Sequence, residues 1–155
     1  MSRFAWFLML GLMAGPASAD LAGDALVQIN QQRGAAGCQP LKMQSQLLAA
    51  AMGHASAMAA QNFFGHTSKN GEKFNQRIRA QGYDGGKTAE NIAAGYGSAN
   101  EVLKSWMGSS GHRRNIMTCA FTQTGLAVVY QADDQPIMGN AAALNYYWVQ
   151  TFGRP

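Results

Sequence analysis

The feature that most constrains the fold is a change in hydrophobic period, from helical in the first two thirds of the chain to alternating near its end. Residues 123–131 and 144–152 alternate and are rich in Val, Tyr, Trp and Thr, which predicts two antiparallel strands with a hairpin tip at residues 133–136. Helical spacing predicts four earlier helices, at residues 20–33, 44–62, 72–81 and 98–109. Helices followed by strands favour an α+β domain, with helices packed on one small sheet.

Local signals set the expected ends of these elements. Ser98 and Glu101 have the S-x-x-E spacing of a capping box, in which the hydroxyl and the carboxylate satisfy free N–H groups of the first helical turn. Gly34 is expected to cap the first helix at its carboxyl end, and Gly82 to close the third. Residues 88–94 are short and small, and their pattern fits either a helix or a strand.

Length and composition narrow the class of protein. A chain of 155 residues corresponds to one domain, and 47% hydrophobic with only 13% charged residues makes intrinsic disorder implausible. The formal charge is +4, but the basic residues are scattered, and Arg113–Arg114 is their only adjacent pair. Nucleic-acid binding needs a concentrated basic face, so no nucleic-acid partner is expected.

The first 19 residues have the layout of a secretory signal peptide. Arg3 is followed by an apolar stretch at residues 4–13, and Ala17-Ser18-Ala19 offers the small-x-small pattern of a cleavage site. Cleavage after Ala19 would leave residues 20–155 as the domain, secreted or periplasmic. No second apolar stretch reaches the length that spans a bilayer, and we expect a monomer.

Export changes the interpretation of the two cysteines. Cys38 and Cys119 lie 81 positions apart, and an oxidising compartment favours a disulfide between them. The chain-entropy model assigns such a loop about 4.5 kcal/mol of stabilisation as an upper figure. The alternative is that one cysteine is a nucleophile paired with a histidine.

Few residues are candidates for catalysis or metal binding. The sequence contains no Gly-x-Ser-x-Gly, P-loop, dinucleotide-binding or His-Glu-x-x-His motif. His54 lies on the inner half of a predicted helix and is expected to be packed rather than a ligand. His66 and His112 lie in predicted loops, and Glu90 stands in an apolar segment where a carboxylate needs hydrogen-bond donors. These three residues could converge into a metal site or an acid/base group.

Five segments, taken in order, resemble the bacterial branch of the CAP superfamily, the SCP-like extracellular domains related to plant pathogenesis-related protein 1 and venom allergens. The segments are residues 62–67, 89–93, 106–117, 121–127 and 148–153, which include Gly65-His66-Thr67, Glu90-Asn91-Ile92 and Ser110-Gly111-His112-Arg113. The resemblance runs from about residue 26 to residue 153. It implies an α-β-α sandwich.

The resemblance also implies a central cavity that holds two histidines and two glutamates. The first histidine falls on His66 and the first glutamate on Glu90, whereas Ser109 stands where the second glutamate is usual in the eukaryotic pattern. Ala120 stands at the usual second histidine, and in the bacterial pattern His112 is its functional replacement. Glu101 and Ser109 are weaker cavity candidates, since the capping box already accounts for Glu101.

Three functions are compatible with these residues. The expected one is a secreted binding module without catalysis, whose partner is a lipid or a cell-wall component. The second is a metal-dependent hydrolase or peptidase, in which His66 and His112 hold a zinc-type ion and Glu90 activates its water. The third is a non-catalytic structural or stress-related envelope protein. No common activity unites the superfamily, so the fold alone assigns none.

Overall fold

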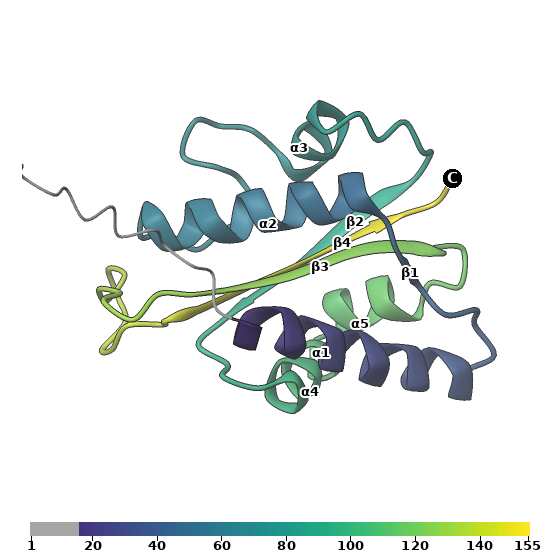
Figure 1. Ribbon diagram of the computed structural model, residues 1–155, viewed down its shortest axis with the longest axis horizontal. Coiled ribbons are helices and arrows are strands. Elements are labelled where there is room, and N and C mark those ends of the chain that lie inside the picture. The colour runs from purple at the N-terminus through teal and green to yellow at the C-terminus, as the bar shows by residue number, and fades with distance from the viewer. Residues whose placement is uncertain (1–15) are drawn as a thin grey trace, which may run out of the picture.

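The computed structural model describes residues 16–155, in which a four-stranded sheet lies between two layers of helices (Figure 1). The strand order is β1-β3-β4-β2, and only the β1–β3 pair is parallel. The strands are β1 (Lys42–Met43), β2 (Thr88–Ala94), β3 (Gln123–Tyr130) and β4 (Tyr146–Gly153). The predicted α+β sandwich with a mainly antiparallel sheet is confirmed, and the ambiguous segment at 88–94 is an edge strand.

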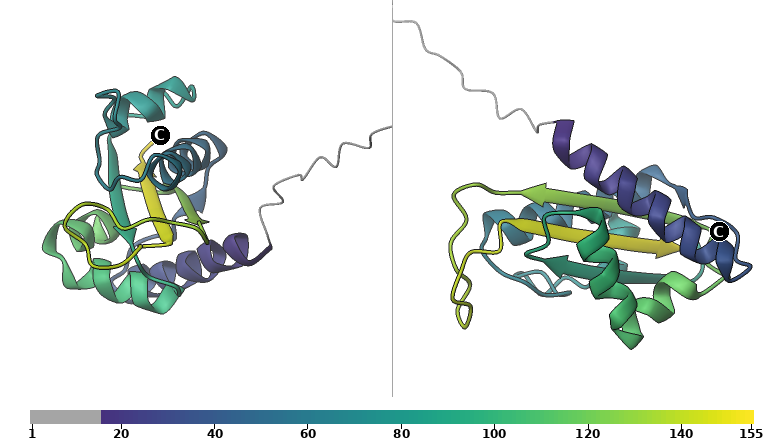
Figure 2. Two further views of the ribbon diagram at one scale, coloured as in Figure 1. Left: turned by 90° about the vertical axis from the view of Figure 1, so that its left-hand side faces the viewer. Right: turned by 90° about the horizontal axis from the view of Figure 1, so that it is seen from below.

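The helices divide between the two faces of the sheet (Figures 1 and 2). One face carries α2 (Ser45–Ala60) and α3 (Phe74–Ala80), and the other carries α1 (Pro16–Ala35), α4 (Ala99–Gly108) and α5 (Ser110–Met117). All four predicted helices are present, with shifted ends. The short helix α5 was not predicted, because Ser-Gly at its start has the composition of a helix stop.

The predicted leader falls largely on residues 1–15, which lie outside the described residues. Helix α1 begins at Pro16, and proline is well suited to the first position of a helix because that N–H has no intrahelical partner. The expected cleavage after Ala19 would cut within the first turns of α1, and it stays a prediction. No helix among residues 16–155 is long and apolar enough to cross a membrane.

The carboxyl end of α1 lies further along the chain than predicted. Gly34 is inside the helix, so the cap assigned to it is wrong. Gly37 has a φ of 79°, and the Cys38 N–H donates to Arg33 O at 2.9 Å. The Gly37 N–H donates to Gly34 O at 3.0 Å, which completes a Schellman motif with Gly37 in the left-handed position.

Two groups hold the end of α1 to the segment after α5. The predicted disulfide between Cys38 and Cys119 is present. Arg33 is fully buried, and its guanidinium donates to main-chain oxygens of Gln39, Ile116, Thr118 and Phe121. The side chain thus satisfies carbonyl groups that would otherwise be costly to bury.

Helix α2 lies unusually close to the sheet. A side chain at Gly125 in β3 would place its Cβ only 2.2 Å from the main-chain carbonyl carbon of Leu47. The Thr151 hydroxyl in β4 donates to Leu47 O at 2.9 Å, and Ala51 and Ala55 on the inner face are completely buried. Small side chains on both elements therefore set this short spacing.

The connection between β3 and β4 spans residues 131–145 and is longer than the tight turn expected at 133–136. Asp134 is only 6% exposed within it. Its Oδ2 accepts hydrogen bonds from Leu144 N, Asn145 N and the Tyr147 hydroxyl. This carboxylate holds the connection against the start of β4.

Candidate functional site

Glu90, in the middle of β2, is the centre of a polar cluster. Its side chain is 1% exposed, Oε1 lies 2.9 Å from Nδ1 of His66, and Oε2 lies 2.8 Å from a terminal nitrogen of Arg77. The buried carboxylate therefore has the donors that its burial requires. The structure brings His66 and Glu90 together, although 24 positions separate them in the chain.

Arg77 on α3 supports both partners, and the sequence did not single it out. Its second terminal nitrogen donates to His66 O, Ser68 Oγ and Glu72 O at 3.0–3.1 Å. One guanidinium thus fixes the loop that carries His66 as well as the carboxylate that His66 contacts. Two features of the sequence could have indicated Arg77. It stands next to Ile78 on the inner side of a short helix, and Glu90 needed a hydrogen-bond donor.

His66 has one nitrogen in the cluster and one free to face solvent. Its Nδ1 contacts Glu90, while the side chain is 50% exposed. With a carboxylate at Nδ1, the neutral ring carries its proton there and presents Nε2 as an acceptor. The imidazole is therefore held at a fixed angle with its outer nitrogen available to a ligand.

His54 is packed, as predicted. It is 1% exposed, Nε2 donates to Gly65 O at 2.8 Å, and the ring meets Phe63 edge-on at 5.9 Å between centroids. Burial, and after it the positive charge of Arg77, holds the pKa of His54 below its usual range. The ring is therefore neutral at physiological pH and fixes the turn that leads into His66.

His112 lies on α5, on the opposite face of β2 from Arg77. Its main-chain oxygen accepts from Asn91 at 3.1 Å, and Asn91 in turn accepts from Asn115 at 2.9 Å. Its ring Nδ1 is buried with no hydrogen-bond partner among residues 16–155. Burial, and after it the nearby His66 ring, lowers the pKa of His112, so the His112 ring is also neutral.

A groove of about 550 Å³ opens beside the cluster, along the first half of β2. Two lysines, an aromatic ring and the His66–Glu90 pair face it. Its lining includes His66, Lys73, Phe74, Lys87, Thr88, Glu90 and Asn115. A volume of this size is ordinary for a small-ligand site.

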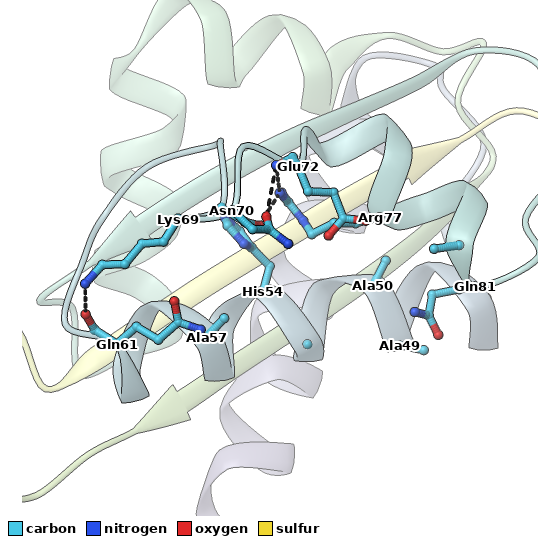
Figure 3. A pocket seen from close by; sticks show the side chains of 13 residues that line it. Ala49, Ala50, His54, Ala57, Gln61, Lys69, Asn70, Glu72, Arg77 and Gln81 are labelled. Atoms are coloured by element: carbon cyan, nitrogen blue, oxygen red, sulfur yellow. Dashed lines mark hydrogen bonds between the residues drawn. The ribbon is translucent and has the colours of Figure 1, made fainter.

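A second, smaller cavity of about 300 Å³ lies on the other side of Arg77, between α2 and the loop after it (Figure 3). Small residues of α2, among them Gly53 and Ala57, form its floor, and His54, Glu72 and Arg77 line it. The nitrogen atoms that lack partners here, His54 Nδ1 and Arg77 Nε, are covered by protein atoms.

The weaker candidates lie elsewhere. Glu101 and Ser109 line a different groove on α4, together with Tyr96 and Lys104, and neither His66 nor Glu90 borders it. Ser98 caps α4 by accepting from Glu101 N at 3.3 Å, and its hydroxyl also contacts Glu101 Oε2 at 2.9 Å. Glu101 is therefore held by the cap of α4.

The residues present do not fit a three-ligand zinc site. Among residues 16–155, no three His, Cys, Asp or Glu side chains are placed to hold one metal ion. Both oxygens of Glu90 are taken by Arg77 and His66. That leaves the imidazoles of His66 and His112, whereas catalytic zinc ordinarily takes three protein ligands.

Comparison with known proteins gives the chain its relatives. Residues 26–152 match the family described as CAP, the cysteine-rich secretory protein family. The uncharacterised protein YkwD of Bacillus subtilis is 35% identical over 101 residues, which are 64% of this chain and 39% of that protein. The uncharacterised membrane protein YlbC of the same species is 31% identical over 78 residues, 50% of this chain and 22% of that protein. The chain thus spans less than half the length of these relatives.

Solved structures share the fold. An extracellular SCP-domain protein from Bacillus anthracis superimposes with a TM-score of 0.74 at 22% identity, covering 89% of this chain and 41% of that one. An outer surface protein of Borrelia burgdorferi gives a TM-score of 0.70 at 21% identity, with 83% and 88% covered. Venom allergen-like protein 4 of Schistosoma mansoni gives 0.57 at 11% identity, with 90% and 89% covered. Because the family match covers most of the chain and the α-β-α sandwich agrees with it, this protein belongs to the CAP family.

Proposed function

We propose that the protein is a secreted or periplasmic binding module that holds a lipid or cell-wall component of the bacterial envelope in the groove along β2. The observation that supports this proposal is the composition of the groove. Lys73 and Lys87 offer positive charge, Phe74 offers an apolar surface, and His66 presents a fixed imidazole nitrogen. Envelope components combine anionic groups with apolar parts, so this lining is suited to them.

Binding without catalysis is favoured by what surrounds His66. Neither a serine nor a cysteine lines the groove, where the hydroxyl groups belong to Thr67 and Thr88, and both cysteines of the chain form the disulfide. Glu90 accepts from Arg77 and from His66, so its carboxylate holds these two side chains in place. The cluster therefore orients a side chain rather than supplying a nucleophile and its base.

Two observations of different kinds support the proposed location outside the cytoplasm. The amino-terminal layout predicts export. The similar solved structures include an extracellular bacterial protein and a bacterial outer surface protein. Both support placing this domain outside the cytoplasm.

A metal-dependent hydrolase is the weaker second candidate: a carboxylate that accepts from a histidine is a common outer partner of a metal ligand, but the described residues leave only two imidazoles to hold an ion. His66 Nε2 and the neutral ring of His112 would be the ligands. Elemental analysis of the purified protein tests this candidate. One zinc per chain, lost in a His66→Ala/His112→Ala double variant, would favour it over the binding module.

Sedimentation with isolated bacterial envelopes tests the proposed function. We expect the exported protein to bind, and Lys73→Glu and Lys87→Glu each to weaken binding at least tenfold. The matched control is Lys104→Glu, which makes the same charge change in the separate groove on α4. Equal losses in all three variants would indicate non-specific charge attraction. Unchanged binding in both groove variants and in His66→Ala would leave a structural envelope protein as the better account.

A further inference from the structure

The hydrogen-bond pattern shows which residues of β2 direct their main-chain groups toward β4. Arg154 N donates to Lys87 O at 3.1 Å, and Gly95 N donates to Tyr146 O at 3.0 Å, at the two ends of the antiparallel pair. In such a pair, alternate residues face the partner strand. The odd-numbered residues of β2 therefore pair with β4, and the N–H and C=O of Thr88 and the other even-numbered residues face the outer edge.

Two helices engage the outward carbonyl oxygens of Glu90 and Ile92. The indole nitrogen of Trp106 on α4 donates to Ile92 O at 3.1 Å, and the Asn115 amide on α5 donates to Glu90 O at 3.4 Å. Thr88 is different. Neither its N–H nor its C=O hydrogen-bonds to another residue within 16–155, and Thr88 is half-buried in the wall of the groove.

An exposed pair of main-chain groups is the feature to which an extended peptide adds as a strand. Here the pair lies between two cations, since Lys73 and Lys87 also line the groove. The negative charge of Glu90 is already compensated by Arg77 at 2.8 Å. The groove therefore presents a strand edge and net positive charge to the same ligand.

We propose that the groove binds the carboxyl-terminal end of a short extended peptide, which pairs with Thr88 and directs its carboxylate to the lysines. A peptide N–H would donate to Thr88 O, a peptide C=O would accept from Thr88 N–H, and a side chain would pack on Phe74. Because the carbonyl oxygens of Glu90 and Ile92 are already occupied, the added strand is limited to about two or three residues. This inference rests on the proposed function and names the peptide part of the envelope as its ligand.

The experiment separates main-chain pairing from charge attraction. A lipid headgroup or an anionic glycan would use the lysines but not the N–H of Thr88. Thr88→Pro removes that N–H together with the threonine side chain, and proline is tolerated at the first residue of an edge strand when its nitrogen faces outward. Thr88→Val keeps the N–H and serves as the matched control.

The probe is acetyl-Ala-Ala-Glu with a free carboxylate, titrated into the exported protein by calorimetry at low salt. We expect Thr88→Pro and Lys73→Glu each to raise Kd at least tenfold, and Thr88→Val to change it less than twofold. A second probe, N-methylated at its middle residue, should bind the unaltered protein at least tenfold more weakly. This probe keeps the test valid if Thr88→Pro does not fold by circular dichroism.

Equal affinity of the plain and N-methylated probes would overturn the peptide inference, as would unchanged binding by a folded Thr88→Pro variant. If the probe fails to bind at millimolar concentration while envelopes still sediment the protein, the peptide inference fails and the proposed function stands. If the probe binds in the expected way but envelopes do not, the proposed function fails and the strand-pairing site stands.

Discussion

On one face of the sheet α1, α4 and α5 pack through large rings, whereas on the other α2 packs through alanines. Trp106, Trp148 and Phe121 are all fully buried on the α1 face, where the Cys38–Cys119 disulfide and the Arg33 guanidinium add fixed links. Both links join segments more than 80 positions apart. This face is organised for stability.

The α2 face combines close packing with a buried charge cluster. Alanines and Gly125 bring α2 against the strands, and at the edge of this layer Glu90 meets Arg77 and His66. Buried charge contributes less to net stability than apolar packing of the same volume. Unlike the buried Arg33 on the other face, this cluster borders a groove, so we take the edge of β2 under α3 as the proposed recognition surface. Four changes test this contrast.

The largest effect should come from removing the disulfide. A Cys38→Ala/Cys119→Ala variant should lose up to about 4.5 kcal/mol of the free energy of unfolding, because the link closes a long loop in the unfolded chain. Urea denaturation measures this loss, and hydrogen exchange should show loosening around His112 and α5. Two reactive thiols in the exported parent protein would contradict the assignment.

Breaking the charge cluster should cost about 3 kcal/mol. Glu90→Gln leaves the buried Arg77 without its counter-charge, and removing one partner of a buried pair is strongly destabilising. An Arg77→Met/Glu90→Gln double variant should recover part of the loss, because it removes the uncompensated charge. The free energies come from urea denaturation, and a single-variant loss below about 0.5 kcal/mol would show that the pair is not buried in solution.

Gly125→Ala should destabilise by about 2 kcal/mol, since the new Cβ would overlap the main chain of α2 at Leu47 and force the helix away. Gly53→Ala in α2 is the matched control. Nothing lies within 4 Å of its added Cβ, so it should stabilise the helix by up to about 1 kcal/mol. Thermal unfolding of both variants checks the pair, and a neutral Gly125→Ala would contradict the close approach.

The smallest effect is the pH dependence of stability. The pKa values of His54 and His112 are lowered in the folded protein, so the unfolded chain binds more protons below about pH 6.5. Their contribution to stability should be complete above that pH and lost as the pH falls through the folded pKa values. His54→Gln keeps a donor for Gly65 O but does not titrate, so its profile from pH 5 to 8 should be flatter. A parent protein that gains stability on acidification would contradict this sign.

The sequence was sufficient for the layers of the fold but not for every element. Hydrophobic period predicted the main helices and the last two strands, whereas the sandwich was implied by the resemblance to the CAP superfamily. Helix α5 escaped prediction because Ser110 and Gly111 are poor helix formers, and tertiary burial of Ile116 overrides that preference. Gly34 was predicted to end the first helix, but the helix continues past it. The cap is made by Gly37, about one turn later.

Some residues of the candidate site were likewise predicted from the sequence, and others were not. The resemblance pointed to His66 and Glu90, and the need of a buried carboxylate for donors indicated that Glu90 had partners. Arg77 could not be assigned, because an arginine on a seven-residue helix ordinarily faces water, and only the fold shows that it reaches Glu90. Arg33 was also missed, because its partners are main-chain oxygens, which no sequence pattern marks.

Chemical-shift mapping tests most directly whether the edge of β2 is the recognition surface. The ¹⁵N-labelled protein would be titrated with soluble fragments of bacterial envelopes, and the shifted amide resonances would be placed on the fold. We predict that the largest shifts fall on Thr67, Thr88 and Ala89, with those of α1 unchanged. Shifts centred on Tyr96 and Ser105 in the groove of α4, or no shifts at all, would contradict the account.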